Sequence, residues 1–262
     1  MHLRKKDTMT SMLFLNSREK VSGENYNARF DIQLPRLNTL RGYRLSLQKV
    51  EFPHNVYPFT DDNTIIYFTD PESADLPVFA TFTNGIYTGA ELAAELQTQM
   101  NAVSAGSPFT VTFSDQTAKF TFAVAGGTGV VSFYSGLANA NEELGIGESM
   151  FSPASAHTST YPVNLSGPQY VDLMTNFSTH NYSVSSAPNI FARIPLLETF
   201  GNIIFYEPHT DDPLFVSETQ LNTVTVRLMN DKGVFYKLPE NAHFSMTLKI
   251  TPVLEGQAEG LF

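Results

Sequence analysis

The fold is decided by the stretch from Tyr43 to Met100, which contains the run Gly85-Ile86-Tyr87-Thr88-Gly89-Ala90-Glu91-Leu92. Before this run, the segment Tyr43-Arg-Leu-Ser-Leu-Gln-Lys-Val-Glu-Phe-Pro53 mixes apolar and polar positions and ends at a proline. A second segment, Thr64-Ile-Ile-Tyr-Phe68, is rich in β-branched and aromatic residues. Both patterns are typical of β-strands.

The run that begins at Gly85 predicts the only long helix of the chain. Thr88 is a favourable N-cap, and Glu91 follows three residues later, as in a capping box. Leu92, Leu96 and Met100 then recur at the spacing of one helical face. We therefore expect a capped helix inside a chain that otherwise consists of strands.

Short segments with β-favouring residues recur along the rest of the chain and predict about a dozen strands. Those at 109–113, 119–123 and 130–134 are expected to form an antiparallel meander. A parallel α/β fold is excluded, because it needs a helix between most strands. The pattern predicts an all-β protein, an antiparallel β-sandwich, and we favour a single jelly roll that carries the helix and meander as an insertion.

The expected domain organisation has three parts. Residues 1–30 form a basic N-terminal arm, residues 31–255 form the jelly-roll domain, and residues 256–262 form a C-terminal tail. Within the jelly-roll domain, we expect the inserted helix and meander at about 84–148. No apolar run approaches the ~20 residues of a membrane span.

The net charge of −10 is unevenly distributed. Residues 1–49 contain ten Lys and Arg against four Asp and Glu, whereas residues 50–262 contain six against twenty-two. One interpretation is a chance cluster on a solvated surface. The other is an assembly arm that lies against nucleic acid or an acidic protein face. The basic residues of this predicted arm are Arg4, Lys5, Lys6, Arg18, Lys20 and Arg29.

No arrangement of residues predicts a catalytic, cofactor-binding or metal-binding site. The 262 residues include no cysteine, which excludes disulfides, thiolate metal sites and cysteine nucleophiles. The pairs Asp61-Asp62 and Asp211-Asp212 lie in predicted turns, where capping of backbone N–H groups is favoured over calcium binding or glycoside hydrolysis. Six histidines are widely spaced, with no metal-binding motif: His2, His54, His157, His180, His209 and His243. We expect no enzyme and no cofactor.

Several motifs follow one another in a fixed order. The strand ending at Pro53 continues into His54-Asn-Val-Tyr57, and the run from Gly85 opens the helix. The later motifs are Leu144-Gly-Ile146, Val163-Asn-Leu-Ser-Gly167, Tyr170-Val-Asp-Leu173, Ala192-Arg-Ile-Pro195, Asn222-Thr-Val-Thr-Val-Arg-Leu-Met-Asn-Asp-Lys-Gly233 and His243-Phe-Ser-Met-Thr-Leu-Lys-Ile250. In this order, over residues 30–252, the chain resembles the penton, or vertex, proteins of double-stranded DNA viruses whose major capsid protein is a double jelly roll, such as virophages and Polinton-like viruses.

The resemblance implies a structural virion protein. Its subunits would form a homopentamer that closes the five-fold vertices of an icosahedral capsid and contacts the double-jelly-roll major capsid protein. Assembly would take place inside the host cell. The basic arm would reach the major capsid protein, other minor capsid proteins or the genome. A five-fold ring uses heterologous contacts, so two different faces of each subunit must be complementary.

Three other interpretations remain open. The first is a viral spike- or fibre-type β-sandwich that binds a receptor or glycan, with loop aromatics such as Tyr57, Phe59 and Tyr161 stacking on sugars. The second is a jelly-roll hydrolase or metal enzyme. The third is a cement or minor capsid protein that lies at the junctions between capsid hexamers.

Overall fold

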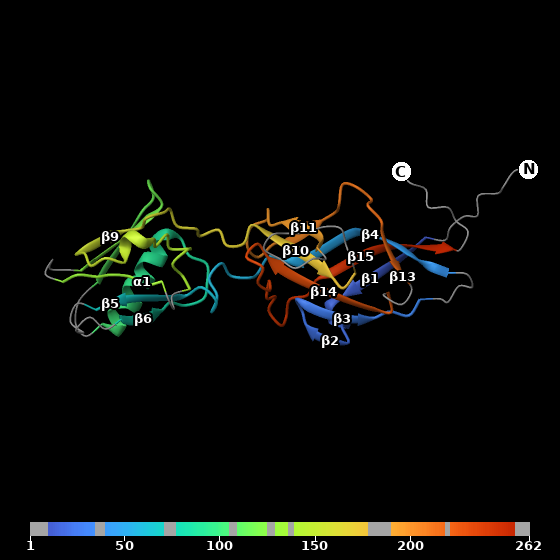
Figure 1. Ribbon diagram of the computed structural model, residues 1–262, viewed down its shortest axis with the longest axis horizontal. Coiled ribbons are helices and arrows are strands. Elements are labelled where there is room, and N and C mark those ends of the chain that lie inside the picture. Colours follow the sequence, from blue (N-terminus) through green and yellow to red (C-terminus); the bar gives the residue numbers. More distant parts are fainter. Residues whose placement is uncertain are drawn as a thin grey trace, which may run out of the picture. The chain divides into compact units, whose positions relative to one another are not determined.

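The chain folds into two compact units (Figure 1). The computed structural model describes residues 10–34, 40–70, 77–104, 109–124, 129–135, 139–177, 190–217 and 221–254. One unit, the jelly-roll unit, consists of Met1–Val56 and Pro168–Phe262. The other, the insertion unit, is Tyr57–Gly167. Each has a hydrophobic core of its own.

The jelly-roll unit is a sandwich of two antiparallel sheets. The strands of the first sheet, in spatial order, are β1 (Ser11–Asn16), β15 (Ser245–Leu254), β4 (Leu40–Pro53) and β12 (Ile203–Tyr206), and β13 (Leu214–Ser217) also pairs with β4. Those of the second sheet are β11 (Ile190–Pro195), β10 (Tyr170–Thr175), β14 (Thr223–Asn230), β3 (Asn27–Asp31) and β2 (Ser22–Glu24). A 3-10 helix, η1 (Ser17–Glu19), connects β1 to β2.

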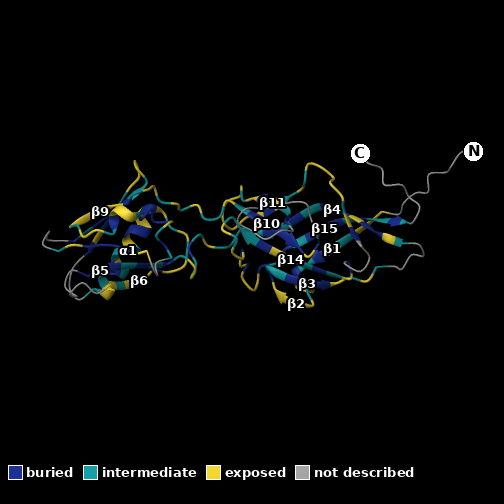
Figure 2. Cartoon of the chain, in the orientation of Figure 1, coloured by how far each residue is buried: buried dark blue, intermediate teal, exposed yellow. Residues whose placement is uncertain are grey.

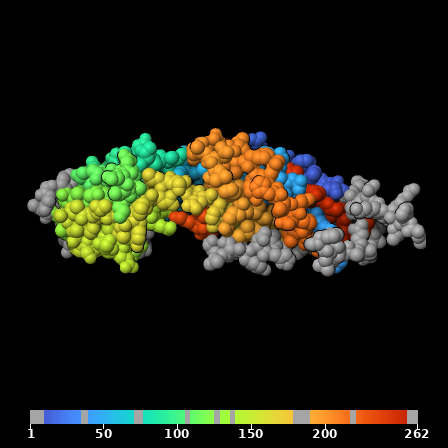
Figure 3. All heavy atoms as spheres, turned by 90° about the horizontal axis from the view of Figure 1, so that it is seen from above, coloured from blue at the N-terminus to red at the C-terminus, as the bar shows by residue number. Residues whose placement is uncertain are grey.

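The strand order is that of a jelly roll. With β2 as an extra edge strand, and β12 and β13 taken as one interrupted strand, the sandwich has eight strands along the chain. The first sheet holds the first, eighth, third and sixth of them, and the second holds the fifth, fourth, seventh and second. This order confirms the predicted all-β jelly roll. In this order the first and the last strand are neighbours. Figure 3 shows β1, near the N-terminus, beside β15, near the C-terminus.

Alternating side chains fill the space between the two sheets. On β14, Val224, Val226 and Leu228 are fully buried, and the residues between them are more exposed. Figure 2 shows buried positions in both sheets. Met246 and Leu248 of β15 bury their side chains in the same core. Each such side chain contributes about 1.5–3 kcal/mol through removal of apolar area from water.

Strand β10 also buries a charge. Asp172 is 1% exposed and lies opposite Arg193 of β11, which donates to both carboxylate oxygens at 2.8 and 3.0 Å. The hydrogen bond to Asp172 raises the pKa of Arg193. The guanidinium also lies 3.9 Å from the ring centroid of Tyr170. The ion pair therefore satisfies a carboxylate that would be costly to bury alone.

The two ends of the sandwich differ in which parts of the chain lie there. Where β4 begins, Leu40 pairs with Leu254 of β15, and the N-terminal strand starts nearby at Ser11. Where β4 ends, Pro53 pairs with Ile203. The insertion unit leaves this second end after Val56 and its chain returns immediately before β10. The described N- and C-terminal residues therefore lie at the end of the sandwich opposite to Pro53.

The insertion unit combines a helix with short sheets. Its elements are the hairpin β5 (Ile65–Thr69) and β6 (Pro77–Thr81), helix α1 (Gly89–Val103), the sheet β7 (Phe109–Ser114), β8 (Lys119–Val124) and β9 (Ala156–Thr158), and the 3-10 helix η2 (Glu148–Met150). Helix α1 contacts β6 and β7. At Gly89 an added Cβ would lie 2.2 Å from the ring of Phe113, so only glycine allows this close packing.

The predicted helix is confirmed. Thr88 Oγ1 accepts from the N–H of Glu91 at 3.3 Å, and Glu91 Oε2 accepts from the N–H of Thr88 at 2.9 Å, which completes the capping box. Accepting hydrogen bonds from Thr88 lowers the pKa of Glu91. Leu92, Leu96 and Met100 are fully buried in the core of the insertion unit.

The structure corrects the extent of the insertion, which was expected at about 84–148. The β5–β6 hairpin belongs to the insertion unit, because Ile66 and Phe68 are buried with Leu96 in one core. At the other end, β9 pairs with β8 and extends the unit to Gly167. The third strand of the sheet was expected at 130–134. In the structure β9 takes that place beside β8, and the segment 130–134 makes only isolated bridges.

The helix core generates a stability prediction. Leu96→Ala is expected to lower the free energy of unfolding of the insertion unit by about 2–5 kcal/mol, because it leaves a cavity under α1. Hydrogen exchange followed by mass spectrometry should show lost protection in 57–167 and unchanged protection in the jelly-roll strands.

The matched control is Thr98→Ala, on the exposed face of the same helix. It should change stability by about 0.5 kcal/mol or less. Equal losses of protection in both units after Leu96→Ala would contradict the division into two cores.

Candidate functional site

The predicted basic arm is folded over most of its length. Residues 11–16 form β1, which pairs with β15 over six residue pairs, and Arg29 lies in β3. Arg18 lies in η1 and Lys20 follows it. The expectation of an arm at 1–30 is therefore wrong for residues 11–30. Arg4, Lys5 and Lys6 lie outside the described residues.

Strand β1 extends over six residues, or about 20 Å, toward the end of the sandwich at which β4 ends at Pro53. Arg18 and Lys20 lie beyond its far end. These two basic residues are therefore part of the folded jelly-roll unit.

Arg18 and Lys20 belong to a fixed corner of the jelly-roll unit. The N–H of Ser17 donates to the carbonyl of Phe244 at 3.0 Å, and Ser17 Oγ accepts from the N–H of Phe244 at 3.1 Å. The same hydroxyl lies 3.2 Å from Nδ1 of His243. Lys20 Nζ donates to Asn25 Oδ1 at 2.8 Å. Burial lowers the pKa of His243, and the nearby positive charges of Arg18 and Lys20 lower it further.

The two units differ strongly in net charge. The insertion unit contains eleven Asp and Glu, and its one basic residue apart from histidine is Lys119. The jelly-roll unit contains fifteen acidic residues and fifteen Lys and Arg. The whole net charge of −10 thus resides in the insertion unit. The jelly-roll unit is formally neutral.

Both acidic pairs lie outside helices and strands, Asp61-Asp62 in a turn and Asp211-Asp212 in the loop between β12 and β13. Asp61 accepts from the amide of Asn84 at 2.7 Å, and Asp212 accepts from the hydroxyl of Thr210 at 3.1 Å. Asp211 forms an ion pair with Lys249. Among the described residues, no group of three or more His, Asp or Glu side chains is arranged to hold a metal ion.

Two further histidines, besides His243, have hydrogen bonds to backbone carbonyl groups. His157 Nε2 lies 2.9 Å from the carbonyl oxygen of Val131, and His54 Nδ1 lies 2.7 Å from that of Glu198. His2 and His180 lie outside the described residues. Within the parts of the chain that the structure describes, no helix is both long and apolar enough to cross a membrane.

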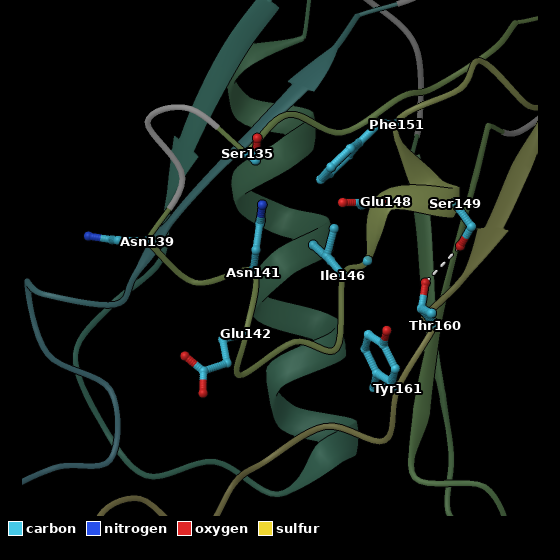
Figure 4. A pocket seen from close by; sticks show the side chains of 11 residues that line it. Ser135, Asn139, Asn141, Glu142, Ile146, Glu148, Ser149, Phe151, Thr160 and Tyr161 are labelled. Carbon is cyan, nitrogen blue, oxygen red and sulfur yellow. Dashed lines mark hydrogen bonds between the residues drawn. The ribbon is translucent and has the colours of Figure 1, made fainter. Parts of the chain in front are cut away.

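The insertion unit contains an open pocket of about 730 Å³ (Figure 4). It lies between the turn around residues 139–147, the 3-10 helix η2 and the segment 160–161 that follows β9. Its polar and aromatic lining includes Ser135, Asn139, Asn141, Glu142, Glu148, Ser149, Phe151, Thr160 and Tyr161. Tyr161 is 63% exposed.

Hydrogen bonds between two segments build this pocket. The N–H of Tyr161 donates to the carbonyl of Gly145 at 3.1 Å, and that of Asn164 donates to the carbonyl of Glu143 at 2.8 Å. The hydroxyl of Ser159 donates to the carbonyl of Leu144 at 2.8 Å. The floor of the pocket is therefore held in place before any ligand binds.

Gly145 makes the close approach of these segments possible. Its φ of +67° lies in the left-handed region, and an added Cβ would lie 2.1 Å from the carbonyl oxygen of Tyr161. The pocket was not foreseen from the sequence, although Tyr161 was a candidate for stacking on sugars. Phe59, another candidate, is fully buried beside Phe82, and Tyr57 does not line the pocket.

Comparisons with known proteins give structural similarities only. The chain is similar to the selenomethionine-labelled mavirus penton protein, with a TM-score of 0.48 and 9% identity over 94% of this chain and 100% of that one. It is also similar to a chain of the Sputnik virophage structure from cryo-electron microscopy, with a TM-score of 0.40 and 12% identity over 94% and 98%. No protein-family model and no curated protein matches the sequence. Because both TM-scores lie below 0.5, the fold is assigned from the strand order alone.

The basic corner generates a prediction for His243. Arg18→Gln is expected to raise the pKa of His243 toward 6.5, because it removes one of the positive charges that disfavour protonation. In the native protein the pKa of His243 is lower than in the unfolded chain. Stability is therefore lost as the pH falls below about 6.5, and Arg18→Gln should reduce that loss.

NMR titration of the imidazole measures the pKa directly. Arg29→Gln is the control, since Arg29 pairs with Asp31 and does not act on His243. An equal rise in both variants would contradict the assignment of this effect to the corner.

Proposed function

We propose that the chain is a penton subunit, a minor capsid protein whose homopentamers close the five-fold vertices of an icosahedral capsid and contact the surrounding double-jelly-roll major capsid protein. The observation that carries this proposal is the jelly-roll strand order of the two sheets, joined to the order of motifs along the sequence. Jelly rolls are common in capsids, but a fold alone does not define a function. Two features of the jelly-roll unit also support the proposal: its exposed apolar residues and the position of its described termini.

The exposed apolar residues suit a ring. On the first sheet, the edge strand β1 exposes Met12 and Phe14, and the strand at the opposite edge, β12, exposes Ile203 and Phe205. Phe14 is 70% exposed and Phe205 is 56% exposed. A heterologous ring needs two different patches on each subunit, one for each neighbour. The two edges of this sheet provide such a pair.

The polarity of the sandwich suits a protein that closes a shell. The described termini lie at one end, and the insertion leaves from the other. One end can thus contact the shell or its contents while the other carries an additional module. In this proposal the segment before Thr10 contributes to contacts with the major capsid protein, other minor capsid proteins or the genome. The protein is accordingly placed in the virion.

The proposed ring can be tested by mass measurement and electron microscopy. The purified chain should have a mass near five times 29.0 kDa and appear as five-fold rings. Phe14→Ser and Phe205→Ser should each shift the mass toward that of the monomer, because each removes an apolar contact of one of the two patches.

Leu197→Ser is the control, since Leu197 is an equally apolar and 85% exposed residue of the same unit outside both patches. It should leave the rings intact. A dimer or trimer that neither phenylalanine substitution dissociates would contradict the proposed ring.

The N-terminal segment generates a separate prediction. Deletion of residues 1–9 should leave a folded protein, because β1 begins at Ser11, but it should lower incorporation into capsids. Deletion of residues 1–30 should prevent folding, because it removes β1, β2 and nearly all of β3. Co-expression with the major capsid protein, followed by particle purification and circular dichroism of the free chain, separates the two effects. Normal incorporation after deletion of 1–9 would refute the role of this segment.

A further inference from the structure

We propose that the open pocket of the insertion unit binds a neutral oligosaccharide, with Tyr161 as the stacking platform. The proposal concerns the insertion unit alone and does not depend on a ring or a capsid position for the jelly-roll unit. The pocket's volume of about 730 Å³ lies within the range of small-molecule sites, about 300–1,000 Å³. It is therefore large enough for a ligand of several polar groups.

Two aromatic rings flank this pocket. Tyr161 is an exposed residue, and Phe151, which follows η2, is half-buried and points into the space (Figure 4). An exposed tyrosine combines an apolar face with a hydroxyl that hydrogen-bonds at its edge. A sugar ring offers the matching chemistry, since it has apolar C–H faces and hydroxyls around its rim. The Tyr161 ring is thus suited to hold a sugar by its flat face.

Unused polar groups lie beside these rings. The Ser135 hydroxyl, the Glu148 carboxylate and the Tyr161 hydroxyl line the pocket and make no hydrogen bond to any described residue. Together they offer donors and acceptors to ligand hydroxyls. By contrast, the Ser149 and Thr160 hydroxyls bond to each other at 2.8 Å. The first three groups are available to a ligand, whereas the bond between Ser149 and Thr160 joins two segments of the pocket wall.

The amides of Asn139 and Asn141 connect the pocket lining to the framework of the unit. Asn139 Oδ1 accepts from the N–H of Ile65 at 2.6 Å, and Asn139 Nδ2 donates to the carbonyl of Asp61 at 3.2 Å. Asn141 Nδ2 donates to the carbonyl of Tyr134 at 3.0 Å. These bonds, with those of Gly145 and Ser159, fix the geometry of the free groups. Such preorganisation lowers the entropy cost of binding.

The charge of the insertion unit restricts which saccharides bind. The unit carries eleven acidic side chains, and two of them, Glu142 and Glu148, line the pocket. Its one Lys, Lys119, is engaged by donating to the carbonyl of Thr160 at 2.9 Å. Sialylated or sulfated saccharides are therefore repelled, with no cation in the described lining to hold their charge. The ligand class is neutral.

A cationic ligand is disfavoured by the arrangement of the carboxylates. Figure 4 shows the carboxylate of Glu142 well separated from Glu148, so the two do not converge on one point. The described residues also contain no cluster of three acidic or histidine side chains for a metal ion. A basic peptide would have to rely on the general negative charge of the unit, and its binding would weaken as salt increases.

The test uses the full chain and a defined set of probes. Saturation-transfer NMR is run with neutral disaccharides of glucose, N-acetylglucosamine, galactose and mannose, with sialyllactose, with a sulfated heparin disaccharide and with an oligolysine peptide. At least one neutral disaccharide should bind, with the same affinity at about 0.05 and 0.5 M salt. Sialyllactose and the heparin disaccharide should not bind.

Variants connect any binding to the pocket. Tyr161→Ala should weaken the affinity by about tenfold or more through loss of the stacking face, and Glu148→Gln should alter affinity without unfolding an exposed position. Tyr57→Ala is the control, because Tyr57 is an exposed tyrosine of the same unit outside the pocket. Absence of binding to every neutral probe, or salt-sensitive binding of oligolysine alone, would overturn the proposal.

Discussion

The jelly roll depends on one strand, β4, which pairs on both sides with strands that follow the insertion. It extends from Leu40 to Pro53, with β15 on one side and β12 and β13 on the other. Leu45, Val50 and Phe52 are buried from this strand into the sandwich core. The sheet cannot close until the chain beyond Gly167 returns to it. Loop closure over such a distance carries an entropy cost that only a large buried core offsets.

This constraint explains why the insertion has a core of its own. Its chain leaves the sandwich after β4 and returns at β10, so its apolar residues are not needed by either sheet of the jelly roll. Instead, Leu92 and Leu96 of the capped helix pack with Phe68 and Phe109. Acidic charge is concentrated in the same unit, whereas the jelly-roll unit is neutral. The two units of one chain therefore differ in both core and charge.

Local signals explain which elements were predictable from the sequence. The helix at 89–103 was predictable because its N-cap, its capping box and its buried face all lie within sixteen residues. Most strands were also recognisable from alternation. Alternation does not indicate which sheet a strand joins. For this reason the sequence alone places the hairpin β5–β6 in the jelly roll, whereas in the structure its residues pack with the helix. Likewise, the cluster of basic residues does not indicate that residues 11–16 form strand β1, because the partner strand, β15, lies at the other end of the sequence.

The pocket illustrates a further limit of sequence reasoning. Tyr161 was recognisable as a loop aromatic, but its neighbours Ser135 and Glu148 acquire meaning only after Gly145 lets two distant segments approach. Nothing in the local sequence predicts that approach. The proposed capsid role has the opposite basis, since it draws on the order of motifs along the whole chain, which carries information that no single motif has.

The most direct test of the assembly role is an icosahedral reconstruction of capsids that contain this protein, with an antibody fragment bound to an exposed loop of the insertion unit as a marker. We expect jelly-roll density at the five-fold vertices, surrounded by major capsid protein, with marker density at the same vertices. Marker density at the junctions between hexamers, with vertices filled by another protein, would contradict the account.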